Sequence, residues 1–391
     1  MTAAAIEGAC RACMRRPWLL SRLGVRLDYR ARGDQSRVLE LLELEDRELI
    51  EAIGGGRRGE LNERWERFEL ADEPAAIDEP DGRTHDSDTG VETACRHCSA
   101  YPSVLRARRG APAVLHVIGG SARLRELTAR PAVAIVGSER PTDYGMEMAH
   151  SLARGLAASG VTVVSGFANG IAAGAHAGAL EVRGPTVTVM AGGVDVVRPA
   201  ARRGLYERVR ARGCAVAEPP CGYLPRRWCR PAQARTIAGL VGLTIVVEAD
   251  EGPRELIGVH AARALGQVVA AVPGRVTSPV SRGTNALLMA GAPLVRGPAD
   301  ALDLLYGVGV PGLRGAHPRG SAAPAKAAKL EPRLQAMLEQ VGAGRDTAGK
   351  LTSAGEDPGE TMLALAELEL MGLLGRGDGG RYVPRESLAG R

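Results

Sequence analysis

The sequence has few aromatic residues and almost no lysine. Phenylalanine, tyrosine and tryptophan make up 3% of the 391 residues, so we expect a core of aliphatic side chains and alanine. Only three of the 50 basic residues are lysines, namely Lys326, Lys329 and Lys350, and the others are arginines. The planar guanidinium group of arginine is suited to binding phosphate oxygens in pairs.

Long hydrophobic runs are also missing. No run reaches the length of about 18 apolar residues that a transmembrane helix needs, and the N-terminus has no signal-peptide pattern. We therefore expect a soluble, cytoplasmic protein without membrane contact. A chain of 391 residues exceeds one typical core, so two or three domains are predicted.

The seven cysteines form an odd-numbered set, which does not suit a disulfide framework. Four of them form two CxxC pairs, Cys10/Cys13 and Cys95/Cys98, which zinc could in principle join. The segment between the pairs is much longer than in a compact zinc ribbon. Free thiols in a reducing compartment are the favoured interpretation, and neither a metal nor a cofactor is expected.

Short β-rich apolar runs recur through the middle of the chain. They start at residues 133, 161, 186, 215, 243, 268 and 293, which are 25 to 29 residues apart, with helical patterns or loops between them. This alternation predicts a Rossmann-like, doubly wound parallel α/β sheet. One intervening helix is predicted over 147–159, with Met148, Leu152 and Leu156 on its apolar stripe and Gly160 just beyond its end.

Composition predicts the remaining domain boundaries. Residues 1–70 form a small helical domain, 71–93 an acidic linker, 94–306 the Rossmann-like core and 307–328 a Gly/Pro/Ala linker. Residues 329–391 show helices followed by a hairpin with Asp378-Gly379 at its turn, which is typical of a winged helix. Glu360, Glu367 and Glu369 on its strongest helix would repel DNA, so we expect this domain to contact a protein.

Two glycine-bearing turns follow the first two apolar runs of the core. Gly137-Ser138 and Ser165-Gly166 each lead into a helical pattern, and parallel strands would place both turns at one edge of the sheet. Free backbone N–H groups and glycine there would let a phosphate approach closely. The alternative is that these glycines only close tight turns.

Positive charge is concentrated after these turns. Between Arg198 and Arg235 there are ten arginines and only two acidic residues, Glu207 and Glu218, although the net charge of the whole chain is only +5. A solvated helix face could account for Arg203 to Arg212, whereas the other arginines lie in a Pro/Gly-rich segment. Such a patch indicates a polyanionic partner.

Seven motifs of the core occur together in a fixed order. Their ranges are Val136 to Gly145 (VGSERPTDYG), Ser165 to His176, Gly193 to Pro199, Glu218 to Gly222, Pro231 to Leu240, Val246 to Ala249 and Ala271 to Asn285. Together they resemble the DprA/Smf family of DNA-processing proteins. The resemblance implies a Rossmann-like homodimer that binds single-stranded DNA. It also implies that the protein loads the RecA recombinase during natural transformation, and so acts in competence and recombination.

The predicted nucleic-acid-binding residues come from the glycine turns and the basic segment. They are Gly137, Ser138, Arg140, Gly166, Gly170, Gly193, Arg198, Arg202 and Arg235. Tyr144, Tyr223 and Trp228 are the only aromatic residues expected nearby, so we predict little base stacking, weak sequence preference and strong salt dependence. The chain departs from the family pattern at Glu139, Ala172, Gln233, Ala234 and Pro253.

Two other functions fit part of the pattern. A nucleotide-processing enzyme would use the same edge of the sheet, with His176 and Asp195 as acid/base candidates. However, a buried structural histidine and a helix- or turn-capping aspartate are the favoured interpretation of those residues, and no catalytic constellation is identified, so an enzyme is not predicted. The departures from the family pattern also allow a degenerate paralogue that acts through protein contacts.

Overall fold

The computed structural model describes residues 9–67, 90–252 and 254–307, followed by 331–343, 345, 347, 350–351, 358–370, 373–376 and 382–384. The chain divides into two compact units, Met1–His317 and Pro318–Arg391. In the described residues, no helix combines the length and apolarity needed to cross a membrane. The two predicted linkers fall largely outside the described residues.

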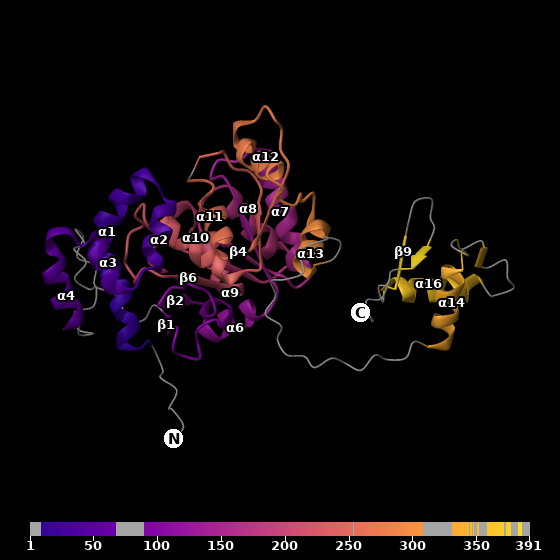
Figure 1. Ribbon diagram of the computed structural model, residues 1–391, viewed down its shortest axis with the longest axis horizontal. Coiled ribbons are helices and arrows are strands. Elements are labelled where there is room, and N and C mark those ends of the chain that lie inside the picture. The colour runs from indigo at the N-terminus through magenta and orange to yellow at the C-terminus, as the bar shows by residue number, and fades with distance from the viewer. Residues whose placement is uncertain are drawn as a thin grey trace, which may run out of the picture. The chain divides into compact units, whose positions relative to one another are not determined.

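Six of the predicted apolar runs form parallel strands of one sheet, of which β4 and β6 are labelled in Figure 1. In spatial order, the parallel part runs β6-β5-β4-β3-β7-β8. The bounds are β3 Ala132–Val136, β4 Thr162–Gly166, β5 Thr186–Val189, β6 Cys214–Ala217, β7 Leu243–Val246 and β8 Val268–Ala271. The seventh run gives only an isolated parallel bridge between Leu294 and Ala271.

The sheet is not parallel throughout, which corrects the predicted topology. β1 (Val91–Cys95) pairs antiparallel with β2 (Val114–Ile118), and β2 pairs antiparallel with β6. The predicted strands begin at residue 133, so β1 and β2 were not among them, and the burial of β2 along its whole length gives no sign of its direction. The result is a mixed eight-stranded sheet.

Helices cover both faces of this sheet because successive strand residues point to opposite sides. Val133 and Ile135 of β3 pack with the apolar residues of α7 (Asp143–Ala158), α8 (Ile171–Glu181) and α13 (Pro298–Tyr306). Ala132 and Ala134 face the other core. The remaining helices of the sheet domain are α5 Ser103–Arg106, α6 Ser121–Ala129, α9 Arg203–Arg212, α10 Cys229–Leu240, α11 Ile257–Ala264 and α12 Arg282–Met289, with the 3-10 helices η4 Ala200–Arg202 and η5 Pro279–Ser281.

Helix α7 shows how local sequence sets an element's ends. It begins four residues before the predicted start because Thr142 caps it, accepting a hydrogen bond from the N–H of Gly145 at 3.2 Å. The residue after the helix, Ser159, is followed by Gly160 with φ +78°, the left-handed conformation expected just beyond a helix end. Leu152 and Leu156 are fully buried as predicted.

The N-terminal helices pack onto the sheet domain. They are α1 Arg11–Gly33, α2 Ser36–Glu43, α3 Asp46–Ile53, η1 Gly55–Arg57 and α4 Arg58–Glu66. Within the predicted helical domain, α1 is one helix of 23 residues that continues through Pro17. Trp18, Leu19 and Leu23 share a core with Val117 of β2 and Trp228 before α10. The helices therefore share a continuous core with the sheet.

The second unit has its own small core. It contains α14 (Pro332–Gly342), α16 (Pro358–Leu370) and an antiparallel pair of strands, β9 (Leu374–Arg376) and β10 (Tyr382–Pro384). Leu334, Leu365 and Tyr382 are among its buried residues. The predicted Asp378-Gly379 turn lies outside the described residues.

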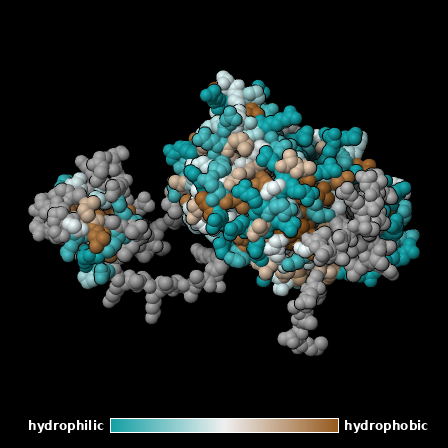
Figure 2. All heavy atoms as spheres, turned by 180° about the vertical axis from the view of Figure 1, so that it is seen from behind, coloured by the Kyte–Doolittle hydropathy of each residue, from teal (hydrophilic) through white to brown (hydrophobic). Residues whose placement is uncertain are grey.

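The face of the molecule opposite to that in Figure 1 is largely hydrophilic. Its apolar atoms form small groups between charged and polar side chains (Figure 2). Such scattered groups are ordinary for a folded domain.

Candidate nucleic-acid interface

The six parallel strands bring most of the predicted site residues to one edge. Because β3 to β8 run in the same direction, the loops after them all leave from the carboxyl edge of the sheet. Gly137, Gly166 and Gly193 lie at or just after the ends of β3, β4 and β5. The sequence therefore located this edge correctly.

The glycines of these turns are closed in by the protein itself. A Cβ atom on Gly137 would lie 2.5 Å from the carbonyl oxygen of Glu248, and one on Gly193 would lie 2.5 Å from that of Pro220. Gly170 has φ +69°, and its Cβ would lie 2.3 Å from the carbonyl oxygen of Ser138. The close approach that these glycines permit is therefore between neighbouring turns.

Ser138 links three of the loops. Its N–H donates to the carbonyl of Glu248 at 2.7 Å, and its own carbonyl accepts from the N–H of Ile171 at 3.1 Å. Its hydroxyl oxygen accepts from the N–H of Arg140 at 3.1 Å. These hydrogen bonds hold the loops after β3, β4 and β7 together. Ser138 itself is only 3% exposed.

A protein carboxylate occupies the start of α7. The side chain of Glu248 is buried and accepts hydrogen bonds from the N–H of Thr142 at 2.8 Å and its hydroxyl at 2.7 Å. A Cβ on Gly145, in the first turn of α7, would lie 2.2 Å from Oε2 of Glu248. Glu248 thus supplies the negative charge that a helix N-terminus favours.

Exposed arginines surround this edge. Arg140 follows β3 and Arg198 follows β5; both are exposed, and neither forms an ion pair within the described residues. Arg202 is half-buried and donates to Oδ1 of Asn169 at 3.2 Å, joining the loops after β5 and β4. These three predicted arginines therefore lie on the same edge.

The structure adds three exposed arginines that the prediction did not include. Arg227 follows β6, Arg254 follows β7 and Arg275 follows β8, and none of them has an ion-pair partner in the part of the chain that the structure describes. The available signal was that each lies in the loop that follows one of the predicted strands. We call the set Arg140, Arg198, Arg202, Arg227, Arg254 and Arg275 the arginine rim.

An acidic departure from the family pattern is neutralised within the rim. Glu139 forms an ion pair with Arg230, which lies in the first turn of α10. Burial and then the neighbouring charge of Arg254 lower the pKa of Arg230. Of the other departures, Ala172 lies in the first turn of α8, Gln233 donates to the carbonyl of Val189 at 2.7 Å, and Pro253 lies outside the described residues.

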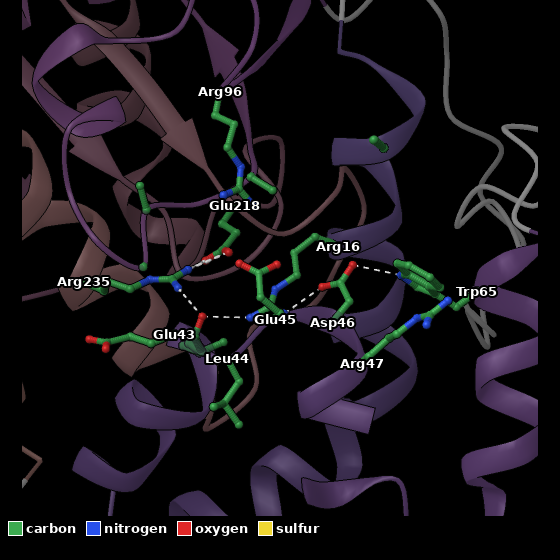
Figure 3. Close-up of a pocket in the computed structure, with 15 residues that line it drawn as sticks. Arg16, Glu43, Leu44, Glu45, Asp46, Arg47, Trp65, Arg96, Glu218 and Arg235 are labelled. Atoms are coloured by element: carbon green, nitrogen blue, oxygen red, sulfur yellow. Dashed lines mark hydrogen bonds and ion pairs between the residues drawn. The ribbon is translucent and has the colours of Figure 1, made fainter. Parts of the chain in front are cut away.

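Arg235 is not part of this edge surface. It is 7% exposed, and its Nη2 donates to both carboxylate oxygens of Glu218 at 2.6 Å. Its Nη1 and the Nη2 of Arg16 both donate to the carbonyl of Leu42, at 3.1 and 2.8 Å (Figure 3). The position predicted to neutralise a phosphate is instead an internal link between α10 and the N-terminal helices.

This link continues along the wall of a cavity of about 350 Å³. Arg16 pairs with Asp46 at 2.7 Å, and the indole of Trp65 donates to the other carboxylate oxygen of Asp46 at 2.9 Å (Figure 3). The cavity is lined by residues of α1 to α4 and by Arg96, Glu218 and Arg235. It therefore lies under the N-terminal helices, and none of the rim arginines lines it.

The predicted aromatic residues are mostly packed. Trp228 donates from its indole to the hydroxyl of Tyr223 at 3.1 Å, and both rings are buried. Tyr144 is 44% exposed, with its hydroxyl donating to the carbonyl of Pro273 at 2.9 Å. Only Tyr144 offers a ring face at this edge among the three candidates.

The two acid/base candidates have structural partners. Burial lowers the pKa of His176 to about 4, and its ring nitrogens lie 2.8 Å from the hydroxyl of Thr186 and 3.1 Å from the carbonyl of Gly166. Asp195 accepts from the N–H of Gly222 at 2.9 Å. Both side chains hold loops of the edge in place.

The structure also gathers a set of possible metal ligands. Cys10, Cys13 and Cys95 come together as considered from the sequence, but the fourth member is His97. Cys98 instead donates from Sγ to the carbonyl of Cys95 at 3.1 Å. The sequence analysis missed His97, although it lies inside the second CxxC pair.

Comparison with known proteins identifies the sheet domain. The family model described as DNA recombination-mediator protein A matches residues 92–306, more than half of the chain. The chain belongs to the DprA/Smf family. This confirms the resemblance found in the sequence motifs, and it gives this DprA/Smf chain the role of a DNA-processing protein.

Individual relatives agree with this membership. The DprA protein of Mycobacterium tuberculosis is 37% identical over 292 residues, covering 74% of this chain and 71% of its own. The Smf protein of Escherichia coli is 33% identical over 206 residues, covering 52% and 54%. The crystal structure of DprA from Streptococcus pneumoniae superposes with a TM-score of 0.54 at 26% identity, covering 71% of this chain and 95% of that one. The predicted Rossmann-like α/β fold is thereby confirmed.

Proposed function

We propose that this DprA/Smf chain binds single-stranded DNA along the arginine rim. The observation that carries the proposal is that loops after five of the six parallel strands each place an exposed arginine at the same edge. A strand of DNA carries one charge per nucleotide, and cations spaced along an edge neutralise successive phosphates.

The chemistry of the rim favours contacts to the backbone of DNA. Tyr144 is the one exposed candidate ring, so base stacking contributes little and sequence preference is weak. Glu139 and Glu251 lie exposed on the same loops and reduce the local positive charge. Affinity then depends on the balance between these carboxylates and the rim.

The geometry argues against a nucleotide-processing enzyme. In such folds the phosphate sits at the N-terminus of the helix after the first strand. Here Glu248 fills that position on α7, with two hydrogen bonds from Thr142. The acid/base candidates His176 and Asp195 are engaged in loop contacts.

Family membership supports the wider role. We propose that the bound strand is protected and passed to RecA during natural transformation and recombination, and that the protein acts in the cytoplasm as a homodimer. The winged-helix-like second unit would contact a protein, since Met362 and Leu363 of α16 are 45% and 54% exposed next to Glu360. Glu367 is less accessible than expected, because it pairs with Arg333 at 2.8 Å.

A salt titration tests the DNA proposal. The full chain would be titrated with a fluorescent single-stranded oligonucleotide at several salt concentrations, alongside the triple variant Arg140→Gln, Arg198→Gln, Arg227→Gln. Because each single-strand phosphate contact contributes about 0.7 to the slope of log K against log salt, the variant should lower that slope by about 2.

The matched control removes three charges from the opposite edge. Arg130, Arg183 and Arg212 are exposed and lie shortly before β3, β5 and β6. Their triple substitution by glutamine should leave the slope unchanged. Equal losses from both triple variants, or salt-independent binding by the wild-type chain, would refute the rim as the interface.

A further inference from the structure

The beginning of α1 and the turn after β1 present four metal-binding side chains to one point. Cys10 is the residue before α1, Cys13 lies in its first turn, Cys95 ends β1, and His97 follows in the turn. The ligand atoms of all four lie within 4.8 Å of one another. Nδ1 of His97 is 3.2 Å from Sγ of Cys10 and 3.4 Å from Sγ of Cys13.

These separations are those of a tetrahedral zinc site. With zinc–sulfur bonds of about 2.3 Å and zinc–nitrogen bonds of about 2.0 Å, ligand atoms on a tetrahedron lie roughly 3.5 to 3.8 Å apart. The two Nδ1–Sγ distances are slightly shorter than this range, so a small outward movement of these atoms would admit the ion. Three thiolates and one imidazole are a soft donor set, which selects zinc over magnesium or calcium.

The backbone prepares both halves of the cluster. The carbonyl of Cys10 accepts from the N–H of Cys13 at 3.0 Å, so the first helical turn places both sulfurs on one side. The N–H of Cys10 points at Sγ of Cys95, 3.4 Å away. Such N–H contacts to sulfur stabilise metal-bound thiolates and orient them.

The exposure of the ligands fits a structural metal. Cys13 and Cys95 are 3% and 1% exposed, whereas His97 is exposed and leaves a path for the ion. The remaining thiols are placed differently: Cys98 bonds within its own turn, and Cys214 and Cys229 lie in the sheet cores. The cluster is therefore a distinct feature of the cysteine set.

We infer that Cys10, Cys13, Cys95 and His97 form a zinc site that fastens the start of α1 to the end of β1. The two halves are 87 residues apart between Cys10 and His97, and the ion closes this long loop. Closing a long loop restricts the unfolded chain, so the bound metal stabilises the attachment of the N-terminal helices to the sheet.

Metal analysis of the full chain tests the inference. Protein purified without metal-chelate chromatography should contain one zinc ion per chain, as measured by inductively coupled plasma mass spectrometry. Cys10→Ser with Cys13→Ser, and separately His97→Ala, should lose zinc or hold it much more weakly. Cys221→Ser, which removes a partly buried thiol elsewhere, and Cys98→Ser should both keep one zinc per chain.

A cobalt titration keeps the test independent of variant folding. Metal-free wild-type protein under reducing conditions should develop the intense visible absorption of tetrahedral Co²⁺ with thiolate ligands, saturating at one equivalent and reversed by zinc. His97→Cys should restore the tetrahedral spectrum that His97→Ala weakens. Three results would each overturn the inference: wild-type protein that binds neither metal, a Cys10–Cys13 disulfide in cell extracts prepared without added reductant, or loss of zinc in Cys98→Ser together with full retention in His97→Ala.

Discussion

Two groups of arginines in the same unit have opposite surroundings. Arg16 and Arg235 are buried under the N-terminal helices, where Asp46, Glu218 and the carbonyl of Leu42 use their donors. Arg140 and Arg198 stand exposed at the carboxyl edge without such partners among the described residues. The same residue type therefore attaches segments inside the protein in one region and is available for the proposed DNA contact in the other, and only the partners distinguish the two groups.

We expect the largest change in stability when one of the buried arginines is removed. Arg235→Ala leaves the carboxylate of Glu218 buried without its partner, and we expect a loss of about 3 to 5 kcal/mol in unfolding free energy. Urea unfolding followed by tryptophan fluorescence measures it. All three tryptophans, at 18, 65 and 228, belong to the first unit, so the signal reports that unit alone.

Two further variants serve as controls for Arg235→Ala. The double change Arg235→Leu with Glu218→Leu should regain most of the lost stability, because no buried charge remains unpaired. Arg140→Gln should alter stability by less than about 0.5 kcal/mol while weakening DNA binding. If Arg235→Ala unfolded like the wild type, the distinction between the two arginine groups would fail.

A second effect concerns the histidine that supports the edge from inside. The folded pKa of His176 is about 4, because burial disfavours its charged form, whereas the unfolded value is about 6.5. Between these values the unfolded chain binds a proton that the folded chain does not. Stability is therefore unaffected above about pH 6.5 and falls as the pH drops from there towards 4, by up to ~3 kcal/mol from this residue.

Urea unfolding over that pH range checks the expectation. His116 is also buried with a pKa of about 4, so it contributes in the same direction. His176→Gln should remove about half of the decline attributable to the two histidines. An unchanged decline in this variant would show that His176 titrates normally in the folded chain.

How far the sequence could lead differs between the two regions. The strands were predictable because each is a short, largely apolar run that is buried over most of its length, and the edge followed from their parallel order. The sequence could not show that Glu248, more than 100 residues after Gly137, fills the first turn of α7, as the bond from Thr142 spans 106 residues. Nor could it separate Arg235 from Arg198, since burial by α2 and the pairing with Glu218 are tertiary.

The same limit applies to the cysteines and to β2. Spacing identified two CxxC pairs, but only the fold brings His97 rather than Cys98 to the start of α1. A strand buried on both faces gives no sign of its direction, so β2 was not recognised as antiparallel. In both cases the sequence does not show which distant segment of the chain packs beside these residues.

The glycine turns give a third, intermediate effect. Gly170→Ala places a Cβ 2.3 Å from the carbonyl oxygen of Ser138 at φ +69°, so a loss of about 2 kcal/mol in unfolding free energy is expected. Gly204→Ala is the matched control, since it has open space in α9 and should raise stability by about 0.5 kcal/mol.

A substitution at Gly166 tests whether this glycine is needed to close the turn or to let a phosphate approach. A Cβ there meets only the flexible side chain of Gln233, 3.0 Å away, so the fold should tolerate Gly166→Ala. DNA affinity should then stay at the wild-type value in the fluorescence titration. A strong loss of affinity with intact stability would show that a phosphate does approach this glycine.

The smallest expected effect is a gain. Glu139→Arg removes a carboxylate from the rim, releases Arg230 from its ion pair and introduces a guanidinium group. With one or two additional phosphates neutralised, the slope of log K against log salt should steepen by about 0.7 to 1.4, and affinity at low salt should rise.

The control for this gain is an ion pair of the same kind at the opposite edge. Glu126 pairs with Arg130 at the end of α6, just before β3, and both side chains are exposed. Glu126→Arg makes the same change in net charge, so a general electrostatic attraction would raise affinity equally in both variants. A gain confined to Glu139→Arg would place the strand at the carboxyl edge, because only there does the added charge lie within reach of its phosphates.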